Sequence, residues 1–393
     1  MCGIVGAIAH RNIVSVLLEG LRRLEYRGYD SAGVAVLDSS GSIDRARSLG
    51  KIRELEKLLA QSPVEGKIGI AHTRWATHGV PAERNAHPHL SQDSVAVVHN
   101  GIIENHEELR KALQAKGYQF TSETDTEVIV HQIQEFLKQG HSLLDAVRKT
   151  TEILHGAYAI GVVSASDPHT LIGARYGSPL VVGLGDSENF IASDIFALVG
   201  ETQRFMFLDD GDIAVLTTES VTIYDKAGQV AQRETNETKL SADAVERGQY
   251  RHYMQKEIHE QAVAVEKTLD GRIHGGKVLP AAFGPLAETA FNGIKAVQIV
   301  ACGTSYHAGM VARYWMEGIA GLPCNVEVAS EFRYRKHVVL PDTLFVTISQ
   351  SGETADTLAA LRLAKAGGYL SSLAVCNVPE SSLVRESESS LLT

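Results

Sequence analysis

The chain opens with MCGIVGAIAH (residues 1–10), and the second residue of this stretch decides how the rest is interpreted. A small residue after Met1 permits removal of that methionine, which would leave Cys2 with a free α-amino group. Such an amine has an ordinary pKa of about 7.7–8.0, so a useful fraction is neutral at pH 7 and can accept a proton. A thiol beside its own base is a candidate nucleophile. The alternative is a small apolar Cys2 at the start of a buried strand, and Met-Cys alone favours that alternative.

The composition is that of an ordinary soluble globular protein. The 393 residues are 44% hydrophobic and 21% charged, which leaves room for two or three domains with ample core. The formal net charge is −10 and there is no basic run, so we expect neither nucleic acid nor a membrane surface as a partner. No segment of the sequence is long and apolar enough to span a membrane.

The cysteines and the opening stretch bear on the compartment. Residues 1–10 lack the basic region and the cleavage site of a signal peptide. Four cysteines, at positions 2, 302, 324 and 376, are too widely spaced for a disulfide framework. They favour a reducing environment, so a cytoplasmic location is predicted.

Residues 2–240 are expected to form one α+β domain. Ile13, Leu17 and Leu21 recur at helical spacing, which predicts a helix. Two more helices are expected to open at Asn105 and Thr124, each followed three residues later by a glutamate, as in a capping box. Short apolar runs predict strands at residues 2–9, 33–37, 68–72, 95–99, 157–163 and 213–217. Many strands with clustered helices indicate a layered arrangement.

The pattern changes in the last third of the chain. Residues 241–285 are charged and polar, with a helical run at 250–269, and are interpreted as a connector between domains. In residues 286–393, predicted strands alternate with predicted helices: strands at 295–301, 325–329, 343–349 and 372–377, helices at 306–318 and 354–366. This alternation predicts right-handed crossovers and an α/β parallel sheet. The chain ends inside the pattern, so we expect an incomplete sheet.

Four residues besides Cys2 suit the hydrolysis of an amide. A turn at Asn100-Gly101 would aim one side-chain amide and one backbone N–H at the same point, as an oxyanion requires. Arg74 follows a predicted strand, and a guanidinium fork suits a carboxylate. Asp125 is expected in the first turn of a helix, where a carboxylate is favoured by the helix dipole and can also bind an ammonium group.

Five histidines in this region raise the question of a metal. They occupy predicted strands and turns, at positions 72, 78, 87, 89 and 99. No pair of cysteines and no cluster of acidic ligands accompanies them, so no metal and no cofactor are expected.

Several longer motifs together resemble a known family. They are MCGIVGAIAH (1–10), RRLEYRGYDSAG (22–33), AHTRWATHG (71–79), HNGIIENH (99–106) and SETDTEV (122–128). These resemble the class II glutamine amidotransferases, whose nucleophile is the N-terminal residue. The resemblance extends to the branch that makes glucosamine 6-phosphate from fructose 6-phosphate, and it runs along essentially the whole chain. It implies a four-layer αββα glutaminase domain, L-glutamine and fructose 6-phosphate as substrates, and a homodimer.

The resemblance also implies roles for individual residues. Cys2 is the nucleophile and its amine the base, while the Asn100 side chain and the Gly101 N–H form the oxyanion hole. The glutamine substrate is held by Arg74 and Asp125, with three further residues on or beside its loop: Trp75, Thr77 and His78. Trp75 is implied as a gate on the path of ammonia, and Arg27 as a residue that orders the closed site.

The last part of the chain resembles the SIS (sugar isomerase) fold. Polar side chains lie at the ends of two predicted strands: the hydroxyls of Thr304 and Ser305 at the first, and those of Ser349, Ser351 and Thr354 with the Gln350 amide at the second. There they can meet a helix start, which is the expected anion site of an open α/β sheet. Neither segment matches the phosphate loop of nucleoside triphosphatases, so a nucleoside triphosphate is not indicated. The resemblance implies a sugar phosphate as the ligand. Cys302 is interpreted as a small packing residue. Since a second SIS domain and the isomerase residues would lie beyond Thr393, these 393 residues are expected to hydrolyse glutamine without making amino sugar.

Two other interpretations stay open on the sequence. One is another class II amidotransferase, such as the phosphoribosyl-pyrophosphate enzyme or asparagine synthetase; the latter needs an SGGxDS-type loop, which SGETAD (351–356) does not match. The other is a regulatory module that binds a sugar phosphate and carries a vestigial glutaminase. The presence of all five glutaminase residues argues against it: Cys2, Arg74, Asn100, Gly101 and Asp125.

Overall fold

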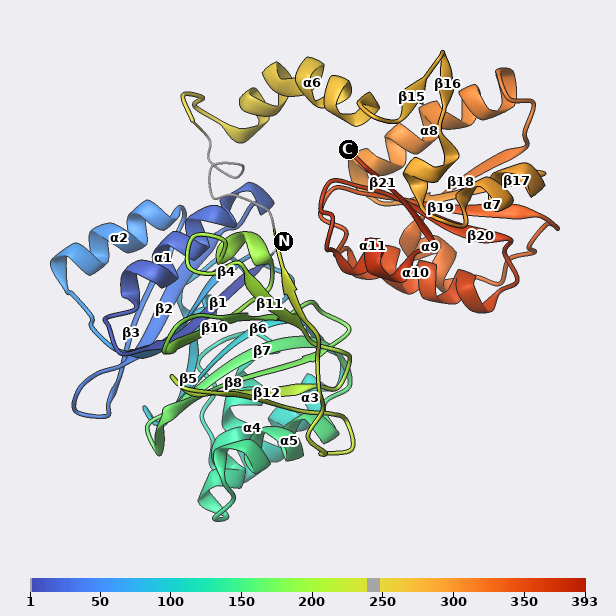
Figure 1. Cartoon of the computed structure of the whole chain (residues 1–393). Helices are drawn as coiled ribbons and strands as arrows, with labels where there is room; N and C mark the ends of the chain where they lie inside the picture. Colours follow the sequence, from blue (N-terminus) through green and yellow to red (C-terminus); the bar gives the residue numbers. More distant parts are fainter. Residues whose placement is uncertain (1, 239–247) are drawn as a thin grey trace. The chain divides into compact units, whose positions relative to one another are not determined.

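The computed structural model describes residues 2–238 and 248–393 (Figure 1). The chain divides into two compact units, Met1–Glu246 and Arg247–Thr393. The boundary predicted between residues 240 and 241 lies outside the described residues, as do the first residues of the predicted connector. Each unit is described by itself.

The first unit contains two antiparallel sheets. The eight-stranded sheet has the order β14 (Thr235–Glu237), β11 (Arg204–Phe207), β9 (Val181–Leu184), β10 (Glu188–Ala192), β1 (Gly3–Ala9), β4 (Ile68–Arg74), β2 (Ser31–Leu37) and β3 (Ile43–Leu49). The six-stranded sheet has the order β13 (Val221–Tyr224), β12 (Ile213–Leu216), β8 (Asp167–Tyr176), β7 (Gly156–Ser164), β6 (Val95–Ile103) and β5 (His89–Ser91).

The two sheets face each other, and helices cover their outer faces (Figure 1). Helices α1 (Val14–Arg23) and α2 (Ile52–Gln61) pack on the eight-stranded sheet, and the other three pack on the six-stranded sheet: α3 (His106–Ala115), α4 (Glu127–Lys138) and α5 (Leu143–Ile153). Alternation along β1 explains the layering, because Val5 packs toward α1 while Ile4 and Ile8 pack between the sheets. The four-layer αββα fold is therefore confirmed.

Both predicted capping boxes are wrong. Helix α3 does begin after Asn105, but the Asn105 side chain donates to Ile153 O at 2.9 Å and accepts the His155 N–H at 3.0 Å. Helix α4 begins at Glu127, three residues later than predicted, and the Glu127 carboxylate accepts the Ser122 N–H at 2.7 Å. Both side chains fasten neighbouring loops: Asn105 bonds a segment far away in the chain, and Glu127 bonds the loop just before its own helix.

The second unit is built on a fully parallel sheet, as predicted. Its order is β18 (Cys324–Val328), β17 (Ala296–Ala301), β19 (Thr343–Ser349), β20 (Ser371–Cys376) and β21 (Ser389–Leu392). Helices α7 (Ala287–Gly293) and α8 (Gly303–Gly318) cover one face. The other face is covered by α9 (Ala329–Tyr334), α10 (Ala355–Ala366) and α11 (Ser382–Glu386). The sequence missed β21, α7, α9 and α11, since segments of four to seven residues carry little periodic signal.

The described part of the predicted connector has secondary structure of its own. It contains helix α6 (Tyr253–Leu269), a hairpin of β15 (Ile273–His274) and β16 (Lys277–Val278), and the 3-10 helix η5 (Pro280–Phe283). The helical run predicted at 250–269 corresponds to α6. Among the described residues, no helix is long and apolar enough to cross a membrane.

Candidate functional site

Cys2 lies immediately before β1, where the backbone of β4 comes close. Its Sγ accepts the Trp75 N–H at 3.2 Å and lies 3.5 Å from the Trp75 carbonyl oxygen. Burial of the sulfur raises the pKa of the thiol, against the lowering effect of the Trp75 N–H. Gly3 permits this packing, because a Cβ there would lie 2.7 Å from Leu24 Cδ1 and 2.8 Å from Thr73 Oγ1. The thiol is thus protonated at neutral pH and requires a base before it can attack.

Asn100 approaches Cys2 from the opposite sheet. Its Nδ2 donates to the Cys2 carbonyl oxygen at 3.4 Å, and its Oδ1 lies 2.9 Å from His72 Nε2. The predicted turn at Asn100-Gly101 is wrong, because β6 continues through Ile103 and both residues pair with β7. A Cβ on Gly101 would lie 2.0 Å from the Ala157 carbonyl oxygen, and its φ of 132° also favours glycine. Close approach of two strands, and not a turn, therefore explains the glycine.

Arg74 ends β4 and braces the loop that follows it. Its Nη2 donates to the carbonyl oxygens of His78 and Gly79, the latter at 3.1 Å. Its Nη1 lies 3.8 Å from Asp30 Oδ1 and has no hydrogen-bond partner among the described residues. The Arg74 side chain is buried, so this N–H group is a desolvated cationic donor beside Cys2.

Asp125 lies just before α4 and not in its first turn, so the predicted role at the helix dipole is wrong. Its Oδ2 accepts the Ile103 N–H at 2.8 Å, at the end of β6. Its Oδ1 lies 4.0 Å from His78 Nδ1, and His78 Nδ1 lies 3.4 Å from Thr77 Oγ1. The carboxylate is thus buried against β6 with one oxygen turned toward the loop after β4.

The loop after β4 carries three of the predicted substrate residues, and it is more exposed than the strands beside it. Trp75 and Thr77 are exposed, and His78 is partly buried. The Ala76 N–H donates to Asp30 Oδ2 at 2.6 Å, which ties the loop to the start of β2. The loop therefore rests on Arg74 and Asp30 while its tip stays open to solvent.

Arg27 lies outside the loop after β4, in the 3-10 helix η1 (Glu25–Arg27). Its guanidinium forms a buried ion pair with Asp194, whose Oδ2 also accepts the Tyr26 hydroxyl at 3.1 Å. The preceding Ser193 accepts the Ile4 N–H at 3.0 Å. Arg27 thus fastens η1 to the segment that borders the first residues of β1.

Four of the five histidines considered as possible metal ligands lie together in the interior, namely His72, His87, His89 and His99. The rings of His72 and His87 stack with centroids 4.2 Å apart, and His87 lies 4.8 Å from His89. Burial lowers the pKa of His72 and of His89 to about 3, and it also lowers the pKa of His87 and of His99. These rings are therefore neutral at pH 7. Within residues 2–238 and 248–393, no group of three or more His, Cys, Asp or Glu side chains could hold a metal ion.

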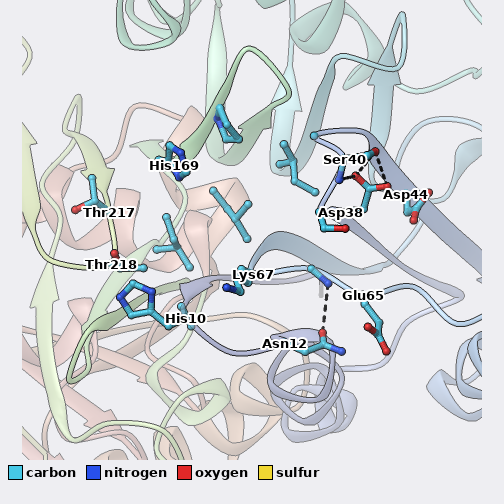
Figure 2. Close-up of a pocket in the computed structure, with 18 of the residues that line it drawn as sticks. His10, Asn12, Asp38, Ser40, Asp44, Glu65, Lys67, His169, Thr217 and Thr218 are labelled. Carbon is cyan, nitrogen blue, oxygen red and sulfur yellow. Dashed lines mark hydrogen bonds between the residues drawn. The ribbon is translucent and has the colours of Figure 1, made fainter.

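A cavity of about 990 Å³ lies at the other end of β1, some 20 Å from Cys2 if a strand rises about 3.3 Å per residue. Figure 2 shows that two of its polar side chains are hydrogen-bonded to other residues that line it: Asp38 accepts the Ser40 hydroxyl, and Asn12 accepts the Gly66 N–H. His10 likewise lies 3.2 Å from Glu219. No cysteine lines this cavity, so its size does not make it the reactive site.

In the second unit, the predicted hydroxyl residues lie at one edge of the sheet. Strands β17 and β19 are parallel neighbours, with Ala301 opposite Ile348, so the loops that follow them are adjacent. Because β18 lies on the other side of β17, this edge is also where the strand order reverses, and open α/β sheets bind ligands there. Thr304 and Ser305 occupy the first turn of α8.

The loop that follows β19 is held by hydrogen bonds to its own serine side chains. Ser349 Oγ accepts the Gly352 N–H at 3.0 Å and lies 3.4 Å from Thr354 Oγ1, while Ser351 Oγ accepts the Glu353 N–H at 3.2 Å. Gln350 is exposed. The loop therefore brings hydroxyls and the start of α10 to the edge of the sheet.

Comparison with known proteins gives two family models. A glutamine amidotransferase domain model matches residues 60–247, and an SIS domain model matches residues 291–393. The chain is 62% identical to glutamine–fructose-6-phosphate aminotransferase (isomerizing) of Pseudomonas putida and 58% identical to the protein of that name from Escherichia coli O6:H1. Both alignments cover all 393 residues of this chain and 64% of the relative's own length.

Among solved structures, a glutamine phosphoribosylpyrophosphate amidotransferase from B. subtilis, in complex with ADP and GMP, matches with a TM-score of 0.52. It covers 95% of this chain and 81% of its own, at 19% sequence identity. At that identity, the match shows a shared fold and nothing further.

Proposed function

This chain belongs to the glutamine–fructose-6-phosphate aminotransferase family, and from that premise we propose that it hydrolyses glutamine at Cys2 and serves the transfer of the released ammonia to fructose 6-phosphate. The observation that carries the proposal is the setting of Cys2: the Asn100 amide donates to its carbonyl oxygen, the Trp75 N–H donates to its sulfur, and the buried Arg74 is close enough to lower the pKa of its thiol. The relatives are longer than this chain, so the transfer step is a proposal for the whole protein.

The first step is attack by the thiolate of Cys2 on the side-chain carbonyl carbon of glutamine. The α-amine of Cys2, free once Met1 is removed, takes the thiol proton and then gives it to the departing nitrogen, so ammonia leaves as a thioester forms. Water then attacks the thioester and releases glutamate with the thiol restored. Because burial raises the pKa of the Cys2 thiol, the thiol needs a base, and the α-amine of the same residue is one.

The charge that develops on the carbonyl oxygen needs fixed donors. Asn100 Nδ2 already faces the Cys2 backbone, and the Gly101 N–H is the second donor in this proposal. Backbone and amide donors that are held in place before the reaction are typically worth about 3–4 kcal/mol in such sites.

The two charged ends of the substrate find opposite charges nearby. Arg74 offers its unpartnered Nη1–H to the α-carboxylate, and Asp125 offers its Oδ1 to the α-ammonium. Trp75, Thr77 and His78 would then close over the substrate, with Trp75 as the gate for ammonia. In this proposal the Arg27–Asp194 pair keeps the closed site ordered.

The second unit would hold the phosphate of fructose 6-phosphate at the edge where the strand order reverses. The groups proposed are the hydroxyls, amide and backbone N–H groups at two helix starts: Thr304, Ser305, Ser349, Gln350, Ser351 and Thr354. A helix start favours an anion because its N–H groups are free and its dipole is positive there. A homodimer and a cytoplasmic location remain predictions from the resemblance and the cysteine content.

The test supplies the 393-residue chain with glutamine, with and without fructose 6-phosphate, and measures glutamate and amino sugar separately. We expect glutamate from the unaltered chain and none from Cys2→Ala. Absence of glutamate from protein with a verified Cys2 N-terminus would overturn the proposal. Amino sugar formed in proportion to glutamate would place the transfer within these residues, against the expectation from the sequence.

A further inference from the structure

The orientation of the Asn100 side chain is decided by two contacts on opposite sides of it. A carboxamide presents N–H groups on one side and a carbonyl oxygen on the other, and a rotation of 180° exchanges them. The Cys2 carbonyl oxygen, 3.4 Å from Nδ2, can only accept. On the other side, His72 Nε2 lies 2.9 Å from Oδ1. The N–H groups therefore face Cys2 only while His72 donates to the oxygen.

The neutral His72 ring has a single N–H, and Asn100 determines where it is. Burial lowers the pKa of His72 to about 3, so one ring nitrogen is unprotonated at pH 7. Since Oδ1 of Asn100 only accepts, the proton must be on Nε2. The other tautomer would place a lone pair against Oδ1 and favour the flipped amide, which turns an oxygen toward Cys2.

A closed set of hydrogen bonds holds the ring against which His72 stacks. The His99 N–H donates to His87 Nδ1 at 3.2 Å, so the proton of neutral His87 is on Nε2. His87 Nε2 lies 3.3 Å from Thr126 Oγ1, which can accept its hydrogen bond. The Thr126 hydroxyl in turn lies 3.0 Å from His99 Nδ1, to which it can donate. His87 is thus fixed in plane and tautomer, and its face supports the His72 ring at 4.2 Å.

We propose that His72 is a positioning residue, which holds the Asn100 amide with its N–H groups toward the oxyanion, and that the His87–Thr126–His99 set holds His72 in place. The inference rests on the proposed glutaminase function. His72 touches no reacting atom in this account and acts through Asn100. Its loss therefore lowers turnover more than substrate affinity, because the oxyanion forms only in the transition state.

Two amides at position 72 make a matched pair. In His72→Gln the longer side chain carries an N–H group to about the place of Nε2, whereas in His72→Asn the amide ends near the place of Nδ1 and cannot reach Asn100. Both are neutral and polar, as His72 is. We expect His72→Asn to lower kcat for glutamine hydrolysis about ten- to a hundredfold with KM within about threefold, and His72→Gln to stay within about threefold of the parent kcat.

A double-mutant cycle separates positioning from a general structural role. Asn100→Ala is expected to lower kcat about a hundred- to a thousandfold. If His72 acts through Asn100, adding His72→Asn to Asn100→Ala lowers kcat by no more than about threefold. A further loss as large as the one seen in the parent would overturn the inference, as would equal losses in His72→Asn and His72→Gln.

A third measurement does not depend on enzymatic activity. Nitrogen NMR of histidine-labelled parent protein reports the tautomer of each ring, and the His72 signal is identified by its loss in His72→Gln. We expect the proton on Nε2, and a proton on Nδ1 would overturn the inference even if His72→Asn failed to fold. Failure of the proposed function is distinguishable, because in that case Cys2→Ala would hydrolyse glutamine as the parent does.

Discussion

The Cys2 site draws its side chains from segments far apart in the chain, whereas the phosphate edge of the second unit takes its hydroxyls from two strand-to-helix loops. In the first, Asn100 and Asp125 are buried and already hydrogen-bonded to other parts of the fold. In the second, Thr304 and Gln350 are exposed, and the loop serines bond the loop's own backbone. Reaction geometry is thus supported by long-range contacts, while anion binding relies on short local segments.

This difference predicts different responses to mutation. A buried side chain that faces a reacting atom cannot be replaced by a neighbouring group, so its loss disables the step of the reaction in which it takes part. In the proposed phosphate site, several hydroxyls and backbone N–H groups at two helix starts would share one phosphate, so the loss of one would be partly compensated. The predictions that follow run from the largest expected effect to the smallest.

Cys2→Ala should abolish glutamine hydrolysis, and Cys2→Ser should do nearly the same, because no other thiol is placed beside Asn100 in the described residues. We expect kcat below about a thousandth of the parent value. Steady-state release of glutamate measures it, with thermal unfolding as the control for an intact fold. Residual turnover above that level would contradict a covalent mechanism at Cys2.

Acidification should destabilise the first unit through its buried histidines. His72 and His89 have a pKa of about 3 in the fold and about 6.5 when unfolded. Between these values the unfolded chain binds protons that the fold does not, so stability falls as the pH falls. Each histidine contributes a loss of about 1.4 kcal/mol per pH unit, or about 3 kcal/mol for both between pH 7 and 5.5. Peptide-resolved hydrogen exchange of residues 2–238 measures this, and protection that does not change with pH would contradict it.

Arg74→Lys should mainly weaken glutamine binding. A lysine ammonium has its donors on a single nitrogen, so it cannot bind the α-carboxylate and also brace the His78 and Gly79 carbonyls as the guanidinium does. We expect KM for glutamine to rise about tenfold or more, a loss of about 1.4 kcal/mol or larger. Initial rates at varied glutamine concentration test this. An unchanged KM would move the carboxylate anchor elsewhere.

Thr304→Val tests the shared phosphate site of the second unit. It removes one hydroxyl from the first turn of α8 and keeps the shape of the side chain. One hydrogen bond is worth about 1 kcal/mol, so the affinity for fructose 6-phosphate should fall about fivefold. Calorimetric titration measures this, with fructose as the control ligand that lacks the phosphate. A loss of a hundredfold or more would mean that this hydroxyl is not shared in the way described.

The sequence predicted best where structure depends on local patterns. Short apolar runs identified β1 and β4, and the proposed phosphate loops lie as expected because each polar cluster directly follows an apolar strand. It failed where a residue's role depends on a distant partner. Gly101 was interpreted as a turn because the Ala157 carbonyl that excludes a side chain is 56 residues away in the chain (157 − 101).

The same limit applies to the buried polar network. His72 and Asn100 belong to different sheets, and no spacing rule connects a histidine on one strand to an amide on another. The capping residue Asn105 was misassigned for the same reason, because it bonds a loop 48 residues away, whereas Glu127 bonds the loop directly before its helix. Four histidines on predicted strands and turns were the available signal, and burial turned them into structural donors and acceptors.

The central claim is that Cys2, as the N-terminal residue, forms a covalent bond to the glutamine carbonyl carbon. Rapid acid quenching of the protein during turnover, followed by mass spectrometry of its N-terminal peptide, tests this directly. The account predicts a peptide that begins at Cys2 and carries one γ-glutamyl group on the sulfur, absent from Cys2→Ala. Active protein that retains Met1, or a glutamyl group on another residue, would contradict it.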